Sequence, residues 1–155
     1  MYGLEAIERD DDIAIVYVKK TPIGDGCEYT VFKSLAEHGI TADVVLKTLS
    51  DDVTAEFVFT VALKDAEKCR EILSEKHKAE ITLIDICENV SLIGISGGGF
   101  MGDAETASVV FKCLMAADVR IIHVSINEMK ISLIVEREDA HKAVATLLEN
   151  FELNA

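Results

Sequence analysis

Two spacings of apolar residues follow one another along the first half of the chain. Residues 13–18 are almost wholly apolar and β-branched, which predicts a buried strand. Apolar residues then fall at helical spacing until Gly39, a natural place for a helix to end. Continued in this way, the pattern predicts strand, helix, strand, strand, helix, strand at 13–18, 25–39, 41–49, 55–63, 65–77 and 80–87.

The same order begins again at residue 90. A strand is predicted at 90–96, a helix at 103–117, a strand hairpin at 119–126 and 128–135, and a helix at 139–151. Short matches join the two halves: 13–18 with 90–95, 31–35 with 110–114, and 64–68 with 138–142. This spacing, near 77 residues, predicts an internal duplication in which each copy is a ferredoxin-like βαββαβ unit.

The second copy ends at Ala155 before its fourth strand, which would leave an open sheet edge. A β-compatible segment at residues 3–9 has no place in the first copy. We expect this segment to complete the second sheet, so that a unit of residues 13–87 is inserted into a unit of residues 1–12 plus 88–155. The predicted class is α+β, with antiparallel sheets and the helices on one face of each.

Composition excludes several kinds of partner. The formal net charge of −13 disfavours nucleic acids and anionic membrane surfaces, which both require a basic protein surface. No apolar run approaches 18 residues and no secretory signal begins at Met1, so we expect a soluble, cytoplasmic protein.

No residue cluster predicts catalysis, a cofactor or a metal site. The four cysteines are scattered without a CxxC pair, which indicates reduced and mostly buried thiols, with a metal or disulfide framework as the alternative. The four histidines lack ligand spacing, and no nucleophile elbow, Walker or zinc signature is present. We therefore expect no catalytic residue in this chain.

A glycine loop at residues 97–102 follows a predicted strand, opens a predicted helix and reads as G-x-G-x-x-G. A dinucleotide site would also need an acidic residue at the end of the next strand, and residues 119–125 contain no carboxylate. We therefore favour the carboxylate of an amino acid, held by backbone amides at the helix start. A structural loop without ligand, and a small nucleotide-binding enzyme, are the alternatives.

The first copy offers a similar loop, with Asp25 as the predicted helix cap and Glu28 three residues on. We expect Asp43, early in the following strand, to lie next to the loop at residues 24–27. Amides would then bind the carboxylate of a zwitterion and Asp43 its ammonium; the alternative is a solvated Asp43. Ile122 beside His123 occupies the matching position of the second copy, which predicts a weaker or purely structural site there.

Four stretches together resemble the C-terminal regulatory region of aspartokinases, and the resemblance covers nearly the whole chain. They are 31–40, 90–94, 125–132 and the ending 147–153. That region is a tandem pair of ACT domains, the first inserted in the second. The resemblance thus implies ACT domain 1 at 13–87 and ACT domain 2 at 1–12 plus 88–155.

The resemblance further implies feedback control of aspartate phosphorylation by lysine, threonine or both, bound between the ACT domains of two subunits in a homodimer. Carried onto this chain, the effector-binding residues are Gly24, Asp25, Gly26, Cys27, Ala42, Asp43 and Val44. The residues of a possible second site are Gly102, Asp103, His123 and Ser125. The implied partner is an aspartate kinase catalytic domain or subunit; the alternative is a dimerisation module that senses nothing.

Overall fold

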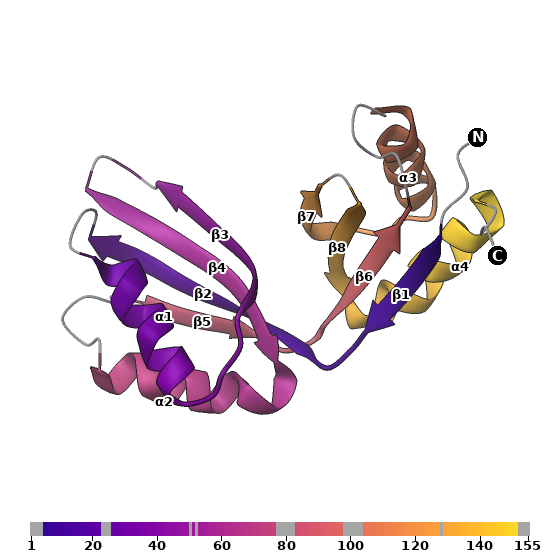
Figure 1. Cartoon of the computed structure of the whole chain (residues 1–155). Coiled ribbons are helices and arrows are strands. Elements are labelled where there is room, and N and C mark those ends of the chain that lie inside the picture. Colours follow the sequence, from indigo (N-terminus) through magenta and orange to yellow (C-terminus); the bar gives the residue numbers. More distant parts are fainter. Residues whose placement is uncertain are drawn as a thin grey trace. The chain divides into compact units, whose positions relative to one another are not determined.

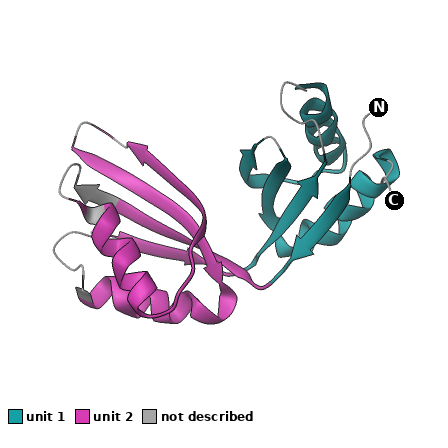
Figure 2. Cartoon of the chain, in the orientation of Figure 1, with its two compact units in different colours: residues 1–11, 89–155 teal, residues 12–88 magenta. Residues whose placement is uncertain are grey.

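The computed structural model describes residues 5–22, 26–49, 51, 53–76, 83–97, 104–127 and 129–151. The chain divides into two compact units (Figure 2). Unit 1 combines residues 1–11 with residues 89–155, and unit 2 consists of residues 12–88. The chain therefore passes between the units twice, at 11–12 and at 88–89.

Unit 2 is a four-stranded antiparallel sheet with two helices on one face (Figure 1). Its strand order is β3-β4-β2-β5, so that β3 and β5 form the edges. Its elements are β2 (Ile13–Pro22), α1 (Cys27–Glu37), β3 (Asp43–Leu49), β4 (Thr54–Ala62), the short 3-10 helix η1 (Leu63–Asp65), α2 (Ala66–Lys76) and β5 (Leu83–Cys87).

Alternation along β4 builds the core of unit 2. Phe57, Phe59 and Val61 are buried against the two helices, because alternate residues of a strand point to the same face. The ring of Phe59 lies 5.5 Å from that of Phe32 in α1, measured between ring centroids, in a tilted arrangement that aromatic pairs favour. This contact fixes α1 on the sheet.

Unit 1 repeats the architecture with one strand taken from the start of the chain. The order of its sheet is β1-β6-β8-β7, and β1 pairs antiparallel with β6 from Ala6 opposite Ser96 to Asp10 opposite Leu92. Its elements are β1 (Ala6–Asp10), β6 (Val90–Ser96), α3 (Ala104–Ala116), β7 (Ile121–Ile126), β8 (Lys130–Glu136), the short η2 (Arg137–Asp139) and α4 (Ala140–Asn150). The predicted α+β fold of two inserted ferredoxin-like units is confirmed.

The duplication extends to individual hydrogen bonds. Gly39 after α1 has a φ of 69°, and Asp118 at the matching place after α3 has a φ of 56°. In both cases the next amide closes the helix by a bond to the carbonyl five residues earlier: Ile40 to Leu35 and Val119 to Leu114, each 2.9 Å. The predicted helix stop at Gly39 is thus confirmed, and Asp118 adopts the same left-handed conformation with an ordinary side chain.

Turn chemistry is also repeated. Before β4, the Asp51 carboxylate accepts the amides of Val53 and Thr54 at 2.8 and 2.7 Å. Before β8, the Asn127 side chain accepts the amides two and three residues on, both at 2.9 Å. These side chains cap the hairpin turns in the manner expected of Asp and Asn.

The expectation of mostly buried cysteines holds for two of the three whose side chains are described: Cys69 and Cys113 are buried, and Cys87 is half-buried. The side chain of Cys27 lies outside the described residues. Among the helices that the structure describes, none is long and apolar enough to cross a membrane.

Candidate functional site

The first helix of unit 2 begins one residue later than predicted. Gly26, not Asp25, occupies the N-cap position, with a φ of 75° and a ψ of 20°, and no side chain caps the helix. The left-handed conformation at the cap suits glycine, because a Cβ would be strained there. Gly24 and Asp25 lie outside the described residues, and Cys27 is the first residue of α1.

A charged pair that the sequence did not predict lies at this helix start. The ammonium of Lys47, on β3, contacts the carboxylate of Glu28 in the first turn of α1 and lies 5.7 Å from the centre of the Phe57 ring. Lys47 pairs with Phe57 across the strands, so both side chains share the helix-covered face. Two hydrogen bonds to the Glu28 carboxylate lower its pKa: the larger effect comes from Lys47, and the smaller from the backbone N–H of Glu28.

The start of β3 is an irregular and strained stretch. Asp43 is exposed, and its carboxylate accepts the backbone N–H of Val44 at 2.8 Å, while its carbonyl accepts the Thr60 hydroxyl at 3.0 Å. A register shift follows Asp43, and Val44 has a φ of 44°. A β-branched residue is rarely found at positive φ, so the backbone at Val44 is strained. The bulge formed there sets the direction in which the strand continues from Asp43. Ala42 packs against the core of unit 2.

The expectation that Asp43 lies next to the loop before α1 of its own chain is wrong. Strands β2 and β3 are both antiparallel to β4 and therefore run in the same direction. Asp43 is opposite Thr60, whereas Pro22, where β2 ends and the loop to α1 begins, is opposite Thr54. Six residues of β4 separate these levels, roughly 20 Å. Figure 1 shows α1 beginning near the arrowhead of β2, while the trace from its other end leads into the start of β3.

The second loop is only partly described. His123 is opposite Ile134 and Ser125 is opposite Ser132, so both side chains lie on one face of β7. The amide of Gly97 donates to the Met129 carbonyl at 3.2 Å, so the first glycine of the loop is engaged within the protein. Gly102 and Asp103 lie outside the described residues, and α3 begins directly after them at Ala104.

Comparison with known proteins identifies the kind of fold and its usual context. A family model described as an ACT domain matches residues 93–151. The regulatory subunit of aspartate kinase from Thermus thermophilus, solved in a ligand-free form, superposes with a TM-score of 0.88 at 25% identity, over 97% of this chain and 99% of that one. This chain is therefore similar, over nearly its whole length, to the regulatory ACT region of aspartate kinases.

The proteins that this chain resembles include much longer ones. The aspartokinase of Helicobacter pylori is 28% identical over 151 residues, which is 97% of this chain and 37% of that protein. Aspartokinase III of E. coli, solved in complex with lysine and aspartate, shares the fold with a TM-score of 0.70 at 18% identity. The chain thus spans a little over a third of the length of the curated relatives it matches.

Proposed function

We propose that this ACT region binds an end-product amino acid, lysine or threonine, and thereby controls an aspartate kinase catalytic domain or subunit. One observation carries the proposal. A helix start suited to a carboxylate and an exposed Asp43 suited to an ammonium lie at opposite ends of the edge strand β3. In an amino acid one carbon separates these two charged groups, so the two ends of β3 in one chain cannot hold them together.

A second copy of the chain resolves this separation. Strand β3 is an edge of its sheet and carries exposed apolar side chains at Val45, Leu46 and Leu49, with exposed fractions of 53%, 53% and 63%. Such an edge favours pairing with another strand. A twofold axis through the middle of β3 would pair it antiparallel with its copy, and would bring Asp43 of one chain to the end of β3 at which α1 of the other chain begins. The homodimer is therefore part of the proposal.

Charge governs the proposed site. The first amides of α1 would hold the effector carboxylate, with Asp43 of the other copy facing its ammonium. Glu28 alone would repel that carboxylate, and Lys47 offsets its charge. Lys47 thus keeps the helix start available to an anion, although the pair is 38% exposed on both sides and screened by solvent.

Control of the kinase then follows from a shift between dimer arrangements. An amino acid bound between two copies stabilises the arrangement that completes its site. A catalytic domain attached to, or associated with, this region would respond to that arrangement, and the coupling energy would equal the difference in effector affinity between the two states.

Calorimetric titration of lysine and threonine into the chain and into Asp43→Ala tests the proposal. Removal of a charged hydrogen-bonding partner is expected to weaken binding by roughly tenfold or more. Asp85→Ala is a matched control, because Asp85 is an exposed carboxylate on the other edge strand of the same sheet. Equal heats for the chain and for Asp43→Ala would remove Asp43 from the site.

A dimerisation module that senses nothing is the rival function, and one feature favours it. The Asp43 carboxylate already accepts a hydrogen bond from the Val44 backbone N–H, and the Glu28 carboxylate accepts one from the Glu28 backbone N–H. Both carboxylates are thus engaged without ligand. Thermal unfolding with each of the twenty amino acids separates the two functions, since a ligand of the folded state raises the melting temperature. A dimer whose melting temperature responds to no amino acid would establish the rival.

A further inference from the structure

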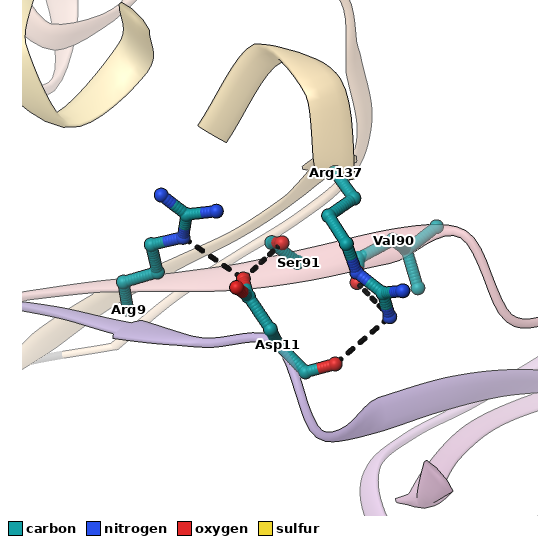
Figure 3. A network of polar contacts seen from close by, with 5 residues as sticks. All are labelled: Arg9, Asp11, Val90, Ser91 and Arg137. Atoms are coloured by element: carbon teal, nitrogen blue, oxygen red, sulfur yellow. Dashed lines mark hydrogen bonds and ion pairs between the residues drawn. The ribbon is translucent and has the colours of Figure 1, made fainter. Parts of the chain in front are cut away.

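Arg137 lies where both connections leave unit 1. It is the first residue of η2, between β8 and α4. Its guanidinium Nη2 donates to the Asp11 carbonyl at 2.9 Å and to the Val90 carbonyl at 3.3 Å, and its backbone N–H donates to the Asn89 carbonyl at 3.1 Å (Figure 3). One residue thus holds the segment that leaves for unit 2 and the segment that returns.

The two segments are also bonded to each other. The Asp11 carboxylate accepts the hydroxyl of Ser91, which is fully buried, and the guanidinium of Arg9 at 2.9 Å. Figure 3 shows the Asp11 side chain directed toward Ser91 and Arg9, while its carbonyl faces Arg137. These contacts, from Arg9, Asp11, Ser91 and Arg137, are here called the clamp.

The other repeat shows which part of the clamp the fold itself requires. Leu63, the first residue of η1, stands where Arg137 stands, and its amide donates to the Asp12 carbonyl at 2.9 Å. That bond matches the one from the Arg137 amide to Asn89, so the backbone contact is common to both units. Unit 2 folds with a leucine at this position. The guanidinium of Arg137 is therefore an addition to the repeat, placed at the unit from which both connections depart.

We propose that the clamp stiffens the two connecting segments where they leave unit 1, here called the joint, so that loosening the clamp also loosens the first contacts of unit 2. One guanidinium nitrogen, Nη2, donates to both carbonyls, and a lysine ammonium would end one bond short of that position on a more flexible side chain. Fixing the Asp11 carbonyl removes freedom from the peptide that leads into unit 2, and fixing Val90 does the same for the return. The stiffening itself does not depend on the proposed function. Only a role of the stiffening in effector signalling would rest on that function.

Amide hydrogen exchange on the whole chain, without any amino acid, tests the joint. Arg137→Leu gives η2 the residue that η1 already has, and Arg137→Lys keeps the charge but ends one bond short of Nη2. Both variants are expected to speed exchange of the Leu63 amide, across the joint in unit 2, by roughly tenfold or more. The Ile131 and Leu133 amides in the unit 1 core are expected to stay protected as in the unchanged chain.

Arg120→Leu is the control, since Arg120 is a 78% exposed arginine of unit 1 that pairs with Glu136. Ser91→Ala is a second variant that removes one clamp contact with a minimal change in volume, and it is expected to give a smaller change in the same direction at Leu63. Unchanged Leu63 exchange in Arg137→Leu and Ser91→Ala, or an equal increase in Arg120→Leu, would overturn the proposal. Effector binding plays no part in this readout, so its absence would leave the result intact.

Discussion

At Val44 a glycine substitution is expected to be more stable than an alanine substitution, which is the reverse of the usual order in a strand. With a φ of 44°, the valine sits where an L side chain costs roughly 1–2 kcal/mol and glycine costs nothing. In an ordinary strand position, alanine is more stabilising than glycine by roughly 0.5–1 kcal/mol. Val44→Gly is therefore expected to be more stable than Val44→Ala by about 0.5–1 kcal/mol. Both variants remove the half-buried valine side chain beyond Cβ, so that loss largely cancels.

The neighbouring residue supplies the control. Val45 is in the same strand and 53% exposed, and it is not among the residues with positive φ in the described chain. There Val45→Ala is expected to be more stable than Val45→Gly by roughly 0.5–1 kcal/mol. Urea unfolding followed by far-UV circular dichroism measures all four variants, which suits a sequence that contains no tryptophan.

The sign of the stability difference between Val44→Gly and Val44→Ala shows whether the backbone at Val44 is strained. If Val44→Ala is as stable as Val44→Gly or more so, the bulge at the start of β3 is not strained as the φ value indicates. Strain of this kind gathers at binding sites, where the surrounding structure maintains it. Amino-acid titration of Val44→Gly then gives a second readout, because a relaxed bulge is expected to weaken binding several-fold while the chain remains folded.

Three further predictions concern single residues. Asp118→Gly is expected to raise stability by roughly 0.5–1 kcal/mol in urea unfolding, because Gly39 fills the same left-handed position; a loss of stability would contradict this. The hydrogen bonds from Arg9 and then Ser91 lower the pKa of Asp11, so its stabilisation is present above about pH 4 and is lost as pH falls through the lowered value. Unfolding of the chain and of Asp11→Asn should therefore converge in acid, and a constant difference would argue against it. Burial raises the pKa of Cys69 to about 11, so a thiol reagent at pH 8 should label half-buried Cys87 before Cys69, which should react only on unfolding; rapid native labelling of Cys69 would refute this.

Much of the fold could be predicted because apolar spacing and turn residues are local signals. Alternating Phe57, Phe59 and Val61 fixed the buried face of β4, and Gly39 fixed the end of α1. The missing last strand of the second copy was enough to predict that a segment near the N-terminus completes its sheet, as β1 does. Such reasoning works because an unpaired edge is costly whatever the neighbouring side chains are.

The candidate site was harder, because it depends on register and direction across strands. Asp43 follows α1 closely in sequence, yet parallel β2 and β3 place it far from the helix start. The Glu28–Lys47 pair joins residues nineteen positions apart, and only the face assignment of Lys47 opposite Phe57 could have indicated it. Positive φ at Val44 leaves no trace in the sequence, since valine normally avoids that conformation.

Complementation between two defective variants tests the two-copy site most directly. Asp43→Ala loses the ammonium partner, and Lys47→Glu places a repelling charge at the α1 start. When the two are unfolded, mixed in equal amounts and refolded, each mixed dimer contains one intact site, so calorimetry is expected to recover about a quarter of the sites of the unchanged chain. Each variant alone is expected to bind weakly. A mixture that binds no better than its two components would show that both determinants act within one chain, and would contradict the account.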